Sequence, residues 1–145
     1  MKFSDKEVHR ILNSRILDAD QICLIGSKSF PKVIRDDWEH RGIPVSDSVD
    51  SKTSQVLLYG ALEDVPDVYM FLKEVNGPAS HNCRITVISF SRLWHSWFKP
   101  KSKSKEIGNW IPPEEIVNLL ELSDLEVVSS RKFILLPIYI PFVSR

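Results

Sequence analysis

Small residues and carboxylates follow directly on an apolar strand in the middle of this chain. Residues 56–59 (VLLY) are a short run of β-forming side chains, which is typical of a strand buried on both faces. Open α/β sheets bind ligands in the crevice beyond the carboxyl ends of their strands. The sequence therefore predicts a crevice after residue 59. Its lining is expected to include Gly60, Ala61 and Leu62, and its mouth Glu63 and Asp64.

One histidine in an aromatic segment is the chain's best candidate for a general base. His95 lies among Trp94, Trp97 and Phe98, directly after a β-branched run at residues 84–90. Imidazole titrates near neutral pH, which suits it to moving a proton. The aromatic side chains either form the wall of a substrate pocket or belong to a helix packed on the sheet.

The sequence shows no motif for a metal site, a hydrolase nucleophile or a nucleotide phosphate loop. The four histidines and two cysteines show no metal-ligand spacing, so we expect no metal site. Neither a G-x-S-x-G elbow nor a P-loop is present, which disfavours hydrolase and nucleoside triphosphatase chemistry. Cys23 and Cys83 both lie in apolar, strand-like runs, so we expect buried, reduced thiols and a cytoplasmic location.

Composition limits the remaining classes of function. The 145 residues suffice for one domain, taken here as 1–145, and 43% hydrophobic with 26% charged residues is typical of a globular protein. Basic and acidic residues balance at 19 each, so no overall field indicates a nucleic-acid partner. Pro137 and Pro141 interrupt the longest apolar stretch, so we expect no membrane span. The lysines of segment 99–105 either bind phosphate or anionic lipid, or belong to a solvated loop.

The elements that must position these residues alternate between helix and strand. Apolar spacing, prolines and glycines mark the boundaries. Helices are expected over residues 4–19, 31–40, 67–75 and 112–122, and extended segments over 21–25, 43–45, 55–59, 84–90 and 125–128. This alternation predicts a mostly parallel sheet with helices on both faces.

Three segments, in order, resemble the class I S-adenosylmethionine-dependent methyltransferases. LEDVPD at 62–67 is similar to the family's Leu-Glu-His-Val-Pro-Asp motif, with aspartate in the histidine position. The next helix, the glycine-proline turn at 77–78 and the RITVISF strand at 84–90 are similar to the elements that follow it. NWIPPEEI at 109–116, with the strand at 125–128, resembles the family's Trp-Pro-Glu-Glu helix and its next strand.

The N-terminal third departs from that family. There the first strand ends in an acidic residue and a glycine-rich turn around the cofactor. In residues 22–30 of this chain only Gly26 matches. Leu24 stands where the acid belongs, and Lys28 and Phe30 stand where further glycines belong. Side chains at these positions keep a ligand farther from the backbone than glycine would.

The element that carries the family's ribose-binding acid is also shortened. Asp47 or Asp50 is a candidate for that role, because a carboxylate accepts two hydroxyl hydrogen bonds. The alternative is that both are loop carboxylates in water. The cofactor-binding set that the resemblance implies is Gly26, Ser27, Asp47, Gly60, Ala61 and Leu62.

The resemblance implies a Rossmann-like three-layer α/β sandwich, trimmed relative to the full methyltransferase fold. It implies S-adenosylmethionine as cofactor and methyl transfer to a small-molecule or carbohydrate-like acceptor, provided that cofactor binding is retained. The alternative hypothesis is a non-catalytic remnant of the fold that serves as a binding or structural module, since fold alone does not decide activity.

Overall fold

A single parallel sheet organises the chain. The computed structural model describes residues 3–16, 21–26, 30–89 and 111–131. The described elements are α1 (Phe3–Ile16), β1 (Ile22–Gly26), α2 (Lys32–His40), β2 (Val45–Ser46), β3 (Gln55–Tyr59), α3 (Val68–Asn76), β4 (Arg84–Ile88) and α5 (Pro113–Leu122). The strand order is β2-β1-β3-β4, and all neighbouring strands are parallel. The predicted class, a small Rossmann-like α/β fold, is confirmed.

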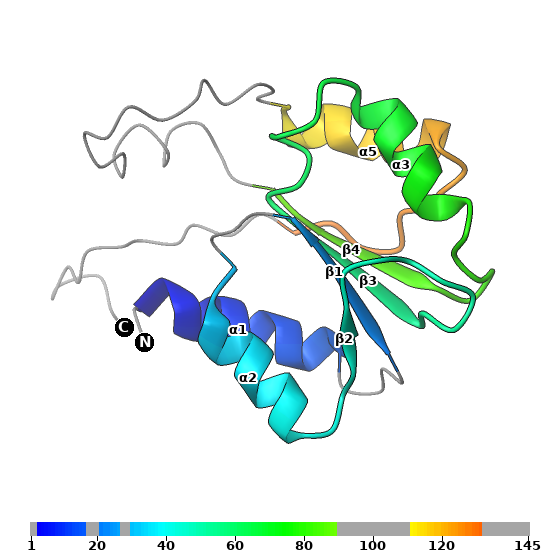
Figure 1. The fold of residues 1–145 in the computed structure, drawn as a ribbon. Coiled ribbons are helices and arrows are strands. Elements are labelled where there is room, and N and C mark those ends of the chain that lie inside the picture. Colours follow the sequence, from blue (N-terminus) through cyan, green and yellow to red (C-terminus); the bar gives the residue numbers. More distant parts are fainter. Residues whose placement is uncertain (1–2, 17–20, 27–29, 90–110, 132–145) are drawn as a thin grey trace, which may run out of the picture.

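Helices cover both faces of this sheet (Figure 1). Every residue of β3 is buried, and its side chains alternate between two cores. Leu57 and Tyr59 pack in the core that contains residues of α1 and α2. Val56 and Leu58 pack in the core on the other face, which contains residues of α3 and has residues of α5 packed against it. The result is the three-layer arrangement that places the strand ends at one edge.

Capping chemistry sets the start of α3, the helix that follows the LEDVPD segment. The Asp67 side chain accepts a hydrogen bond from the backbone N–H of Met70 at 2.9 Å. It thereby satisfies one of the N–H groups that have no partner within the first turn. The acidic and proline-containing segment is therefore a helix start, as predicted from the sequence, and it fixes where the chain turns after β3.

The edge strand β2 is unusually short. It pairs with β1 only through Ile22 with Val45 and Cys23 with Ser46. β3, by contrast, pairs with all five residues of β1. The carboxyl-terminal half of β1 therefore pairs with β3 on one side, and β2 does not reach it on the other side. This edge position agrees with Pro44, which directly precedes β2 and suits an edge.

One predicted strand is wrong. Residues 125–128 were expected to be extended and paired, but they belong to no strand. The backbone N–H of Leu125 bonds back to Leu120 O at 3.1 Å, and Val128 is 90% exposed. β-forming side chains do not make a strand without a partner, and none pairs with this segment in the described ranges. His95 with its aromatic neighbours, the lysines of segment 99–105, and Pro137 with Pro141 lie outside those ranges.

Candidate functional site

The order of the strands brings the ends of β1 and β3 together at a topological switch point. After β1 the chain continues to α2, whose residues pack on one face of the sheet, and after β3 it continues to α3 on the other face. Gly26 at the end of β1 pairs with Tyr59 at the end of β3. In open α/β sheets ligands bind where neighbouring strands send their connections to opposite faces. The predicted position of the site, at these two carboxyl ends, is therefore a geometric feature of the fold.

Glycine is required at the end of β1. Gly26 has a φ of +142°, and a Cβ added there would lie 2.2 Å from the carbonyl oxygen of Tyr59. No side chain fits that gap without moving the backbone of β3. The single glycine that matches the methyltransferase turn is therefore also needed to pack β1 against β3.

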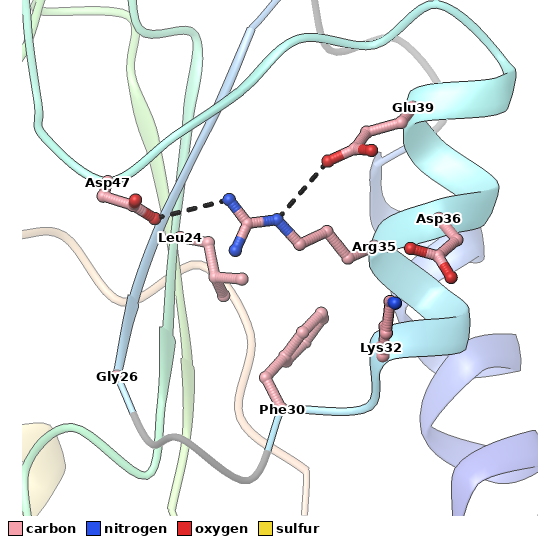
Figure 2. A pocket seen from close by; sticks show the side chains of 8 residues that line it. All are labelled: Leu24, Gly26, Phe30, Lys32, Arg35, Asp36, Glu39 and Asp47. Atoms are coloured by element: carbon pink, nitrogen blue, oxygen red, sulfur yellow. Dashed lines mark ion pairs between the residues drawn. The ribbon is translucent and has the colours of Figure 1, made fainter.

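An open pocket of about 510 Å³ begins at this glycine and runs between the end of β1 and helix α2 (Figure 2). It occupies the side of β1 on which β2 has already ended. Its floor is apolar and its rim is charged. The lining residues are Leu24, Gly26, Phe30, Lys32, Arg35, Asp36, Glu39 and Asp47.

The guanidinium of Arg35 crosses the pocket. Its Nε lies 3.5 Å from Glu39 Oε1, one turn along α2, and its terminal nitrogen lies 3.7 Å from Asp47 Oδ1, directly after β2. Figure 2 shows the side chain extending from α2 toward Asp47, with Leu24 and Phe30 below it in this view. The carboxylate predicted to bind ribose hydroxyls therefore has a cation beside it.

Phe30 forms the aromatic part of the pocket wall. Its ring centroid lies 5.0 Å from that of Tyr59 in an edge-to-face arrangement, and 5.6 Å from that of Trp38. Such pairs stabilise each other beyond the area that they bury. A large ring thus stands where the methyltransferase resemblance expects a glycine, and packing with Tyr59 and Trp38 holds it in place.

The end of β3 is built differently. Gly60 has a φ of +59° and donates its N–H to Ile88 O at 2.8 Å, which directs the chain across the end of β4. Ala61 and Leu62 then pack in the core beneath α3. Glu63 is also buried, and its Oε1 accepts a hydrogen bond from Ser89 Oγ at 3.0 Å, whereas Asp64 is exposed. This turn joins β3 to β4 and α3.

The predicted cofactor-binding residues therefore separate into two groups. Gly26 and Asp47 line the pocket, whereas Gly60, Ala61 and Leu62 are buried and are not part of its lining. Ser27 and His95 lie outside the described residues. The sequence did not predict the charged residues that α2 contributes to the pocket. Helical spacing places them on one face of α2, but it does not distinguish a pocket rim from a solvated surface; they are Lys32, Arg35, Asp36 and Glu39.

Asp50, the second ribose candidate, has a local structural role. Its Oδ1 accepts hydrogen bonds from Thr53 Oγ1 and from the backbone N–H of Lys52, both at 2.9 Å. The Thr53 hydroxyl is the main reason that the pKa of the Asp50 carboxyl lies below its usual value. Because it closes the loop before β3, Asp50 is committed to a turn and only Asp47 is at the pocket.

The two cysteines are free thiols; Cys23 is buried, as expected from the sequence, whereas Cys83 is only partly buried. Burial raises the pKa of Cys23 and of Cys83 above the ordinary thiol value. Both are therefore protonated near neutral pH, which disfavours a nucleophilic role. Within the described ranges, no three histidine, cysteine, aspartate or glutamate side chains come together as metal ligands.

Comparison with known proteins adds no assignment. No protein-family model matches the chain, and no match was found among curated proteins. A separate search of the described helices finds none with the length and apolarity needed to cross a bilayer. The functional argument therefore depends on the fold, the pocket and the sequence motifs.

Proposed function

We propose that this chain is an S-adenosylmethionine-dependent methyltransferase-like domain that acts on a small-molecule or carbohydrate-like acceptor. The observation that carries the proposal is the position of Gly26 and Asp47 on one pocket at the switch point of a parallel sheet. The resemblance of segments 62–67, 84–90 and 109–116 to that family supports the same function. Two free, protonated thiols support the cytoplasmic location that we include in the proposal.

The pocket residues have functions that fit this cofactor. The bound cofactor would supply an activated methyl group on a sulfonium. Asp47 would accept hydrogen bonds from neighbouring sugar hydroxyls, which is the chemistry of an exposed carboxylate. Gly26 would keep the ends of β1 and β3 together beside the ligand, and Leu24 and Phe30 would exclude water from one side. Methyl transfer then requires mainly that the acceptor be aligned, so positioning is the protein's principal contribution.

A second function, in which the fold is kept as a non-catalytic binding or structural module, has specific support. Phe30 replaces a glycine of the cofactor turn, and its ring is held by Tyr59 and Trp38. Leu24 replaces the acid and is only 9% exposed within the core. Together these side chains reduce the space and the polar groups offered to the amino-acid end of the cofactor.

Ligand-dependent stabilisation separates the two functions. S-adenosylhomocysteine that binds only the folded domain raises the free energy of unfolding by about 2.7 kcal/mol when present at one hundred times its Kd. We expect a rise in melting temperature with the wild-type chain and with Asp64→Ala, which alters an exposed residue away from the pocket. Asp47→Ala should lose most of the rise. An unchanged melting temperature of the wild-type chain at millimolar ligand would exclude the methyltransferase function for this chain.

A further inference from the structure

Arg35 occupies the space left by the short strand β2. Because β2 stops beside Cys23, no residue of β2 pairs with Leu24 or Gly26. Arg35 reaches into this place from α2, and its guanidinium lies between Glu39 and Asp47. A longer β2 would have continued the sheet along the rest of β1. The Arg35 side chain lies in part of that space instead.

The charges of the pocket oppose an anion and favour a ligand that donates hydrogen bonds. Two cationic side chains line it, against three carboxylates, which are Lys32 and Arg35 against Asp36, Glu39 and Asp47. Arg35 already has two of these carboxylates beside it, so it has little attraction left for an added anion. Asp47 is the carboxylate on the sheet side of the pocket, and Arg35 is the cation paired with it, at 3.7 Å.

We infer that Arg35 controls access to Asp47. The guanidinium is paired with the carboxylate, and a ligand with neighbouring hydroxyls competes with it for the oxygens of Asp47. The displaced guanidinium keeps Glu39 as its partner, because that residue lies one turn away on the same helix. This inference rests on the proposed function, since it concerns the sugar-binding carboxylate of the same site.

The pair is weak enough to open. The Asp47 side chain is 80% exposed and that of Arg35 is 38% exposed, and their atoms are 3.7 Å apart. Exposed ion pairs of this kind contribute little and are screened by salt. The predicted effect on affinity is therefore modest, and it must decrease as the ionic strength rises.

The test measures binding of adenosine and of S-adenosylhomocysteine by isothermal titration calorimetry, at about 0.05 and about 0.5 M salt. Arg35→Met removes the charge and keeps an apolar stem. Arg41→Met removes an arginine that pairs with Asp37 and does not line the pocket, and it is the matched control. Arg35→Lys keeps the charge without the forked geometry. Denaturant unfolding of each variant verifies that it is folded.

We expect Arg35→Met to bind adenosine about two- to fivefold more tightly than the wild-type chain at low salt, and equally at high salt. Arg41→Met should bind adenosine as the wild type does.

Three results would overturn it. Equal adenosine affinity of the wild-type chain and Arg35→Met at low salt would remove the control by Arg35 and leave the proposed function intact. Weaker binding of S-adenosylhomocysteine by Arg35→Met, with adenosine unchanged, would instead make Arg35 the anchor of the ligand's carboxylate. Failure of both ligands to bind both proteins would overturn the proposed function and the inference together.

Discussion

The carboxyl ends of β1 and β3 are neighbours in the sheet, yet they are built for different purposes. After β3 the chain enters the core: Ala61, Leu62 and Glu63 are all less than a tenth exposed. After β1 the sheet opens onto a pocket with a charged rim, to which Arg35 and Asp47 contribute. The segment that most resembles a methyltransferase motif is thus the structural side of the switch point. The segment that differs most from the methyltransferase motifs, residues 22–30, lies on the side that has room for a ligand.

The two strand ends therefore differ in what a substitution there would disturb. Residues 62–67 turn the chain from β3 into α3, and a change there would disturb the core beneath that helix. Gly26 and Phe30 border the pocket, where a substitution would also alter a ligand's surroundings. A segment that resembles a family motif can thus have a packing role whether or not a ligand binds beside it.

The largest effect expected from this comparison is at Leu62. Leu62→Ala should lower the free energy of unfolding by about 2–5 kcal/mol, because the side chain is 1% exposed in the core beneath α3 and its removal leaves a cavity. Denaturant unfolding measures the loss, and Leu122→Ala, at a position 65% exposed, should change it by less than about 0.5 kcal/mol. Unchanged stability with reduced ligand affinity would instead place Leu62 in the binding site, and would break the comparison.

The fold could be predicted because its strands, turns and helix starts are each determined by residues close together in the sequence. Three such signals are visible in the sequence alone. They are the apolar run at 55–59, the glycines at the ends of β1 and β3 (Gly26 and Gly60), and the Asp67 cap. The parallel sheet then follows from the alternation of strands and helices. Residues 125–128 show the limit of this approach, since a strand also needs a partner in space.

The site could be predicted only in part. The resemblance to the methyltransferases indicated Gly26, and it indicated Asp47 with Asp50 as the alternative. The contact between Arg35 and Asp47 could not be anticipated, because it depends on where β2 stops and on how α2 lies over the edge of β1. Charged residues on an exposed helix face carry no pattern that separates a pocket rim from an ordinary solvated surface.

Gly26 tests the other half of the comparison. Gly26→Ala should destabilise the domain by about 1–3 kcal/mol from backbone conformation alone, with a further cost from the contact with Tyr59 O. Gly42→Ala is the matched control, because Gly42 also has positive φ, at +74°, but an added Cβ would meet nothing within 4 Å. Thermal or denaturant unfolding of the two variants isolates the contact. Equal losses would mean that the ends of β1 and β3 are not tightly joined at this point.

The smallest effect concerns the buried carboxyl at the end of β3. Ser89→Ala removes the hydroxyl that donates to Glu63 Oε1, and should cost about 1 kcal/mol, near the net value of one hydrogen bond, because Ser89 itself is exposed. Glu63→Gln keeps an acceptor for that hydroxyl. Comparing the stability of the double variant with that of the two single variants then measures the coupling between Glu63 and Ser89. Since this pair joins the ends of β3 and β4 away from the pocket, neither substitution should alter the affinity for S-adenosylhomocysteine in calorimetry. A changed affinity would show that ligand contacts extend from the open end of β1 to the closed end of β3, and the two ends would then form one site.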